Sequence, residues 1–118
     1  AFNPGPSMAV YFATKAYVLH LSEAVAQECA GSGVTVTALC PGATATGFHR
    51  TAGFPEDSWL FAPPMAERPE LVARYGARAL FAGRRVAIPG LANKLSVLAI
   101  RFLPRRVAVI LTHRVLRH

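Results

Sequence analysis

Acidic side chains are scarce in this sequence and absent from its last stretch. Residues 1–90 carry seven Lys and Arg against six Asp and Glu, a balance of +1, whereas residues 91–118 carry six cations and no acid. Nearly all of the formal net charge of +7 therefore lies in this basic tail, residues 91–118. Such a tail indicates an anionic partner, either a lipid surface or a nucleic acid. Because the tail has almost no aromatic side chains on which bases could stack, we do not expect nucleic acid.

Cysteine is also rare, and long apolar runs are missing. Cys29 and Cys40 are the only two cysteines, and their separation is not that of a CxxC motif. We therefore expect two reduced thiols, no metal site and a cytoplasmic protein, with peripheral membrane contact by the tail as an alternative. No apolar run reaches the roughly 18 residues that a spanning helix needs.

The 118 residues suffice for one domain with a modest core. The sequence begins without Met inside a loop-like phrase, FNPGPSM. We therefore expect it to be a piece of a longer protein.

Hydrophobic periodicity and the positions of Gly and Pro predict the order of elements. They indicate a helix over 8–30, a strand over 34–40, an irregular segment over 43–66, a helix over 68–82, a strand over 86–90 and two tail helices divided at Pro104. A helix, a short turn and an apolar strand in succession are typical of a parallel α/β sheet. The first helix is apolar on nearly every side, which predicts burial on more than one face, and the first strand is expected to be central and covered.

The helix over 8–30 contains the sequence YFATK, in which Tyr11 and Lys15 lie four positions apart. On a helix, side chains with this spacing project from the same face. One interpretation is a core Tyr beside a Lys whose ammonium reaches solvent. The other is chemical, because a nearby ammonium favours the phenolate form of a Tyr and makes it a plausible proton donor and acceptor for alcohol–ketone interconversion.

The residues after the predicted strand favour the chemical interpretation. The strand over 34–40 is followed by PGATAT, residues 41–46. Open parallel sheets bind ligands at the carboxyl ends of their strands. The loop amides, carbonyls and Thr hydroxyls of this segment could hold an amide or a phosphate there.

Together these motifs resemble the C-terminal half of a classical short-chain dehydrogenase/reductase. The resemblance rests on Tyr11 and Lys15 of YFATK, on the following helix and strand, and on Pro41, Gly42 and Thr46 of PGATAT, with VAIPG at 86–90 as the last strand. It implies an α/β fold, the C-terminal part of a Rossmann-like doubly wound parallel sheet with flanking helices, over residues 1–90, followed by a helical tail over 91–118.

The resemblance also implies roles for single residues. Tyr11 would be the general acid/base, and Lys15 would hold the nicotinamide ribose and favour the phenolate. Pro41, Gly42, Thr44 and Thr46 would contact the nicotinamide carboxamide or the pyrophosphate. The cofactor would be NAD or NADP, with NADP favoured.

The resemblance also implies a substrate region and an oligomeric assembly. Residues 47–66 would form the substrate loop. Met8, Phe48, Phe54 and Trp59 would line the site for an apolar alcohol or ketone, although Phe54 and Trp59 could equally be simple packing. The helix of residues 8–30 would form the interface of a homo-oligomer.

The sequence also departs from the family pattern. It contains no TGxxxGxG phosphate loop, and the family's catalytic Ser would fall before Ala1. We therefore expect a longer parent to be an enzyme and the isolated chain to be inactive. An alternative function rests on the tail, where Leu103, Val107, Ile110, Leu111 and Val115 could form an apolar stripe flanked by Arg, suited to an anionic membrane or to a protein partner.

Overall fold

The computed structural model describes residues 1–53 and 66–116. The sequence predictions for Phe54, Trp59 and most of the substrate loop lie outside these residues. The elements are α1 (Ala9–Glu28), β1 (Ala38–Leu39), α2 (Phe48–Thr51), α3 (Pro69–Phe81), β2 (Val86–Ala87), α4 (Leu91–Phe102) and α5 (Arg105–Leu116). The described part of the chain is thus mostly helical, with one two-stranded sheet.

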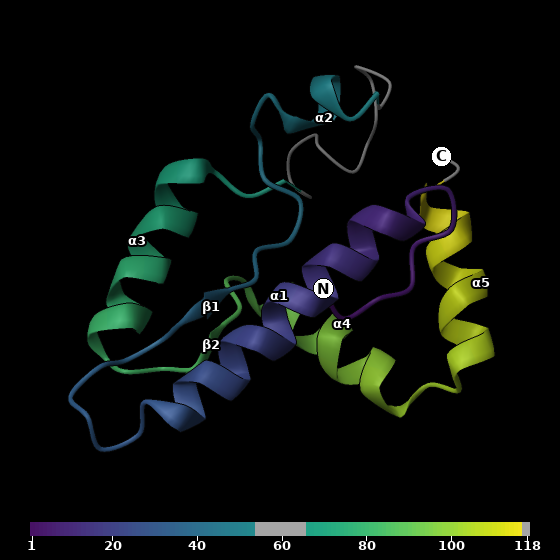
Figure 1. Cartoon of the computed structure of the whole chain (residues 1–118). Coiled ribbons are helices and arrows are strands. Elements are labelled where there is room, and N and C mark those ends of the chain that lie inside the picture. The colour runs from purple at the N-terminus through teal and green to yellow at the C-terminus, as the bar shows by residue number, and fades with distance from the viewer. Residues whose placement is uncertain (54–65, 117–118) are drawn as a thin grey trace.

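The two strands are parallel and pair Ala38 with Val86 and Leu39 with Ala87. The backbone N–H of Ala38 donates to the carbonyl of Arg85, and that of Cys40 donates to the carbonyl of Ala87, both at 2.8 Å. In Figure 1 the strand pair lies between α3 and α1, and α3 belongs to the connection that makes the two strands parallel. This is the βαβ arrangement expected from the order of elements.

The first strand is shorter than the sequence predicts. The alternation over residues 34–40 indicates a seven-residue strand, but only Ala38–Leu39 form a ladder. Val34 is 59% exposed and Leu39 is 40% exposed, so the strand is not covered as expected. Within the described residues β2 is the single neighbour of β1. The strand therefore extends only over the residues that pair with β2.

The first helix is also less buried than its composition predicts. Leu19 and Ala26 are its buried residues, whereas Val10 is 78% exposed and Tyr17 67% exposed. Only one side of α1 is covered by the described parts of this chain, chiefly through its contact with β1. The helix ends where expected, and Gly31 and Gly33 both have φ of +83°, a conformation that other L-residues rarely adopt.

The core is built from small side chains. The buried apolar residues are Leu19, Ala26, Ala38, Val72, Ala79, Ala87 and Ala108. The radius of gyration of 15.1 Å exceeds the about 13.5 Å typical of a compact domain of this length. Much apolar surface therefore remains in contact with solvent.

The tail forms two helices divided at Pro104, as predicted. Proline lacks the backbone N–H that a continuing helix needs, and its ring disfavours helical geometry at the residue before it. Accordingly α4 ends at Phe102, and Leu103 has an extended backbone with ψ of 141°. In Figure 1 the second tail helix, α5, lies at the edge of the molecule beside the N-terminal segment.

Candidate functional site

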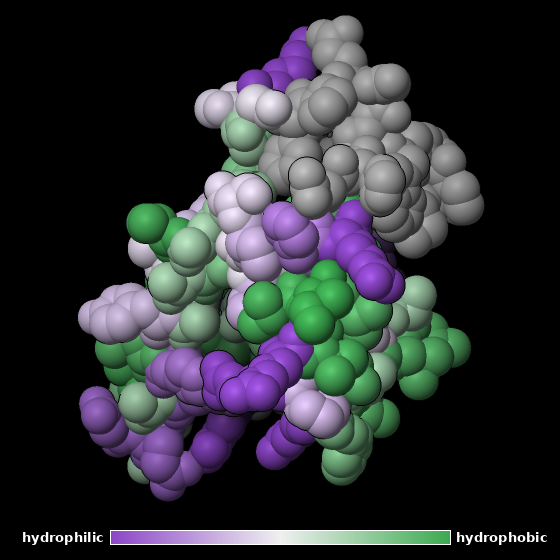
Figure 2. Space-filling view, turned by 90° about the vertical axis from the view of Figure 1, so that its right-hand side faces the viewer, coloured by the Kyte–Doolittle hydropathy of each residue, from purple (hydrophilic) through white to green (hydrophobic). Residues whose placement is uncertain are grey.

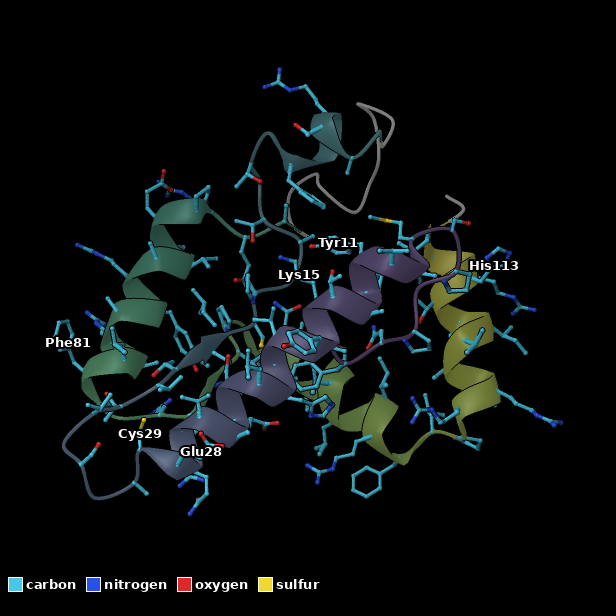
Figure 3. All side chains as sticks on the ribbon, in the orientation of Figure 1. Tyr11, Lys15, Glu28, Cys29, Phe81 and His113 are labelled. Atoms are coloured by element: carbon cyan, nitrogen blue, oxygen red, sulfur yellow. The ribbon has the colours of Figure 1, made fainter. Side chains whose placement is uncertain are left out.

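One turn of α1 places Tyr11 and Lys15 together. The Lys15 Nζ lies 5.4 Å from the centroid of the Tyr11 ring, within the range of a cation–π contact. Figure 3 shows both labelled residues on the part of α1 nearest the segment that leads to α2. Within the described residues, neither the Tyr11 hydroxyl nor the Lys15 ammonium has a hydrogen bond or an ion pair. Both groups are therefore available to a ligand.

Aromatic side chains hold the Tyr11 ring. The ring of Phe48, from α2, lies 5.4 Å from it, centroid to centroid, at an interplanar angle of 35°. The ring of Phe12 lies 5.7 Å away at 80°, an edge-to-face arrangement. Tyr11 is 37% exposed. These contacts fix the ring while leaving part of the phenol accessible.

The chain that follows β1 is held by backbone pairing. Thr44 and Glu67 form an isolated parallel bridge. The N–H of Ala45 donates to the Glu67 carbonyl at 3.0 Å, and the N–H of Glu67 donates to the Ala43 carbonyl at 2.9 Å. The Thr44 hydroxyl donates to the Gly42 carbonyl at 3.2 Å. The PGATAT segment is thereby fixed at the carboxyl end of β1, where the sequence predicts a ligand loop.

Asn93 in the first turns of α4 supports this loop, and the sequence analysis did not identify it. Its amide Nδ2 donates to Oε1 of Glu67 at 3.1 Å and to the Pro89 carbonyl at 3.0 Å. Gly42 lies against the same side chain, so closely that a Cβ at Gly42 would collide with the Asn93 amide. Glu67 and Asn93 are 26 residues apart, and no local pattern indicates that they meet.

A single cavity joins these parts. It has a volume of about 1120 Å³ and is lined by residues from α1, β1, α2, α3, α4 and α5. All of the predicted site residues that the structure describes line it: Met8, Tyr11, Lys15, Pro41, Gly42, Thr44, Thr46 and Phe48. Their contribution to catalysis or binding stays a prediction.

The cavity suits the nicotinamide half of a dinucleotide in size and in donor groups. Ligand pockets typically measure about 300–1000 Å³, so this cavity has room for a nicotinamide nucleoside and an apolar substrate. Lys15 offers ammonium donors, and the polar side chains of Thr44 and Thr46 also line the cavity. No TGxxxGxG loop that could hold the remaining phosphates occurs in the sequence.

Cys40 lies in the cavity wall next to Pro41. Burial raises the pKa of its thiol, Glu23 adds to this effect and the N-terminal amine opposes it. A raised pKa favours the neutral thiol over the nucleophilic thiolate. Cys40 is therefore suited to packing and not to nucleophilic chemistry, and both cysteines are free thiols in half-buried positions.

The remaining titratable residues do not assemble a second centre. His20 is exposed and pairs with Glu23 at 3.6 Å, as expected for a surface His. In residues 1–53 and 66–116 no group of three His, Cys, Asp or Glu side chains could hold a metal ion. Over the same residues no helix is long and apolar enough to cross a membrane.

Gly42→Ala is expected to destabilise the chain by about 1–3 kcal/mol, because the new methyl group must displace the Asn93 amide. Gly47→Ala is the matched control, since the nearest atom to a Cβ there is the Arg50 Nη2 at 3.7 Å, an ordinary contact. Urea unfolding of both variants measures the difference. Equal midpoints for the two would contradict the close contact, and adding Asn93→Ala should recover part of the loss in Gly42→Ala.

Comparison with known proteins gives one match. Residues 1–56 match a family model described as short chain dehydrogenase. No curated protein sequence and no solved structure matches the chain. The matched segment contains α1, β1 and α2, and with them all the predicted site residues in the described part of the chain.

This match supports a fragment of the short-chain dehydrogenase family, a family of oxidoreductases, over residues 1–56, and it confirms the resemblance drawn from YFATK and PGATAT. The match does not extend to residues 57–90, so a single family domain over 1–90 with a separate tail stays a prediction.

Proposed function

We propose that this chain supplies the Tyr–Lys part of the active site of an NAD(P)-dependent oxidoreductase that interconverts an alcohol with a ketone or aldehyde. The observation that carries the proposal is the cavity, which is lined both by Tyr11 and Lys15 of α1 and by residues of the PGATAT segment after β1. The family of residues 1–56 supports the same reaction class.

In this proposal Tyr11 moves the proton and Lys15 assists it. The bound nicotinamide supplies or accepts the hydride at the substrate carbon. During alcohol oxidation the ionised Tyr11 hydroxyl takes the proton of the substrate hydroxyl, and during reduction it returns a proton to the carbonyl oxygen. The Lys15 ammonium, which lies over the Tyr11 ring, stabilises the phenolate and donates to the ribose hydroxyls.

The loop after β1 would position the cofactor. Pro41, Gly42 and the backbone near Thr44 would face the carboxamide, and Thr46 would contact the carboxamide or the pyrophosphate. Asn93 and Glu67 would act as positioning residues, because they hold this loop without themselves being required for proton transfer.

The substrate would be an apolar alcohol or ketone. Phe48 packs on the Tyr11 ring, and Met8 lines the same cavity. Both would cover the substrate on the side of the phenol. We extend the same expectation to Phe54 and Trp59 as residues of the substrate loop.

The fold and assembly belong to the same proposal. The pair β1 and β2 would be part of a larger Rossmann-like sheet, which would cover the exposed side of β1. The exposed face of α1, with Val10 and Tyr17, would form a homo-oligomer interface. NADP is the favoured cofactor, and the parent enzyme is expected in the cytoplasm.

Titration with NADPH tests whether the cofactor site is divided between this chain and the rest of a longer protein. The 118-residue chain is expected to leave NADPH fluorescence unchanged, because its sequence has no Gly-rich phosphate loop. The longer protein, expressed from the full reading frame that contains this chain, is expected to bind NADPH. It is also expected to oxidise NADPH when an apolar ketone is supplied as the substrate. Absence of binding and turnover in that longer protein would contradict the proposed function.

A further inference from the structure

The helix α4 presents an apolar stripe to solvent. Leu91 is 73% exposed, Leu95 57%, Leu98 52% and Phe102 80%. These positions follow the i, i+4, i+7, i+11 pattern, which places the four side chains within an arc of about 60° on a helix. We call them the α4 stripe.

The opposite side of α4 is the one that packs on the protein. Asn93, Val97 and Ile100 are half-buried and line the cavity. They lie about half a turn away from the α4 stripe. The stripe therefore points away from the cavity, and α4 contains no buried residue.

The sequence also predicts an apolar stripe on α5, and in the structure Val107, Ile110, Leu111 and Val115 are exposed. In α5 the inward residues Ala108 and Thr112 are buried, and Leu111 and Val115 line the cavity. The side of α5 opposite Ala108 carries Arg106 and Arg114 as well as Ile110. Both tail helices therefore expose apolar side chains, and the stripe on α4 is the more exposed of the two.

Exposed cations lie on α4 and at the start of α5, and residues 91–118 contain no acid. Arg101 lies on α4, and Arg105 and Arg106 follow directly after Pro104; all three are exposed. Lys94 is the exception, because its Nζ lies 5.5 Å from the Tyr75 ring centroid and so is directed toward α3. The ion pairs found in the described residues, His20–Glu23 and Arg68–Glu70, involve none of these cations.

Apolar and hydrophilic groups therefore share one surface. On the face of the molecule that includes α5, green apolar surface lies directly beside purple hydrophilic side chains (Figure 2). A helix with an exposed apolar stripe and flanking Arg lies flat in the interface of an anionic bilayer, with its apolar side chains in the acyl region and its cations at the phosphates.

We propose that α4 and the start of α5 form a peripheral membrane-binding surface for anionic lipid. The α4 stripe enters the interface, and Arg101, Arg105 and Arg106 contact the headgroups. The charge of the tail favours a lipid surface over a second copy of this chain as the binding partner. A second copy would place its own six tail cations against the six tail cations of the first, and the like charges would oppose the contact. An anionic lipid surface instead complements them.

Vesicle flotation of the full 118-residue chain tests the proposal. We expect binding to vesicles of phosphatidylcholine and phosphatidylserine at low salt, weak binding to phosphatidylcholine alone, and a marked loss at 500 mM salt. Leu95→Ser with Phe102→Ser is expected to lower the partition coefficient on anionic vesicles about tenfold or more. Arg101→Gln with Arg105→Gln should lower it on anionic vesicles while leaving phosphatidylcholine binding unchanged.

Phe81→Ser is the matched control. Phe81 is 90% exposed at the end of α3, and Figure 3 shows it on the far side of the molecule from α5. This variant should bind vesicles like the parent chain. Far-UV circular dichroism measures whether each variant keeps its helices. If the variant with Leu95→Ser and Phe102→Ser unfolds, the variant with Arg101→Gln and Arg105→Gln still tests the surface.

Three results would overturn the proposal. The first is equal binding to both vesicle types, or binding to neither. The second is unchanged binding after both pairs of substitutions. The third is a dimer in solution that Leu95→Ser with Phe102→Ser dissociates while the chain binds no vesicles, which would assign the α4 stripe to a second copy.

Discussion

Tyr11→Phe is expected to lower kcat of the NADPH-binding longer protein by about 10²–10⁴-fold, the usual contribution of a positioned acid or base. The substitution removes only the hydroxyl, so the aromatic contacts with Phe12 and Phe48 persist. NADPH affinity should therefore change little. Steady-state ketone reduction and NADPH fluorescence titration measure the two quantities separately.

The matched control is Tyr17→Phe on the same helix. Tyr17 is 67% exposed and does not line the cavity. Because Phe keeps the aromatic ring that Tyr17 would bring to the proposed interface, the variant should leave kcat within about twofold of the parent. A similar kcat for Tyr11→Phe and Tyr17→Phe would remove Tyr11 from the reaction.

Lys15→Met is expected to lower kcat/KM by about 10²–10⁴-fold, because one ammonium serves both the phenolate and the ribose. Methionine keeps most of the aliphatic length but lacks the charge. The variant should lose NADPH affinity as well as turnover, unlike Tyr11→Phe. Steady-state turnover and NADPH titration provide the measurements.

Lys15→Arg serves as its control, since it keeps a cation one turn from Tyr11. Partial activity in this variant with none in Lys15→Met would identify charge as the property required. If Lys15→Met binds NADPH and turns over like the parent, Lys15 is an ordinary surface residue whose Nζ merely lies over the Tyr11 ring.

Local signals in the sequence predicted the helices well. Pro69 occupies the first position of α3, and α1 ends three residues before Gly31. Pro104 divides the tail. These boundaries follow from backbone chemistry that acts within a few residues, so the sequence alone suffices to place them.

Pairing and burial were predicted less well, since they depend on distant partners. The alternation in 34–40 predicted a longer and covered strand, but only Ala38 and Leu39 meet a neighbouring strand within the described residues. The apolar composition of α1 likewise predicted burial that one covered side does not provide. In both cases the apolar pattern indicates a preference for burial. The described part of the chain contains too few packing partners to bury these apolar side chains.

The candidate site was predicted through its contiguous motifs. Tyr11 with Lys15 and Pro41 with Gly42 are neighbours in sequence, and the cavity contains all four. The support from Asn93 and Glu67 was missed, because a single Asn beyond a short strand carries no local signature. The exposed stripe on α4 was missed for a similar reason: both tail helices are amphipathic, and packing decides how much of each apolar side faces outward.

A crystal structure of the longer protein with NADP⁺ and an apolar alcohol tests the central claim most directly. The account predicts the nicotinamide in the cavity between α1 and the PGATAT segment, with the substrate hydroxyl about 2.6–3.2 Å from the Tyr11 hydroxyl and the Lys15 ammonium at the ribose. A nicotinamide bound away from Tyr11, or one contacted by neither Lys15 nor residues 41–46, would contradict it.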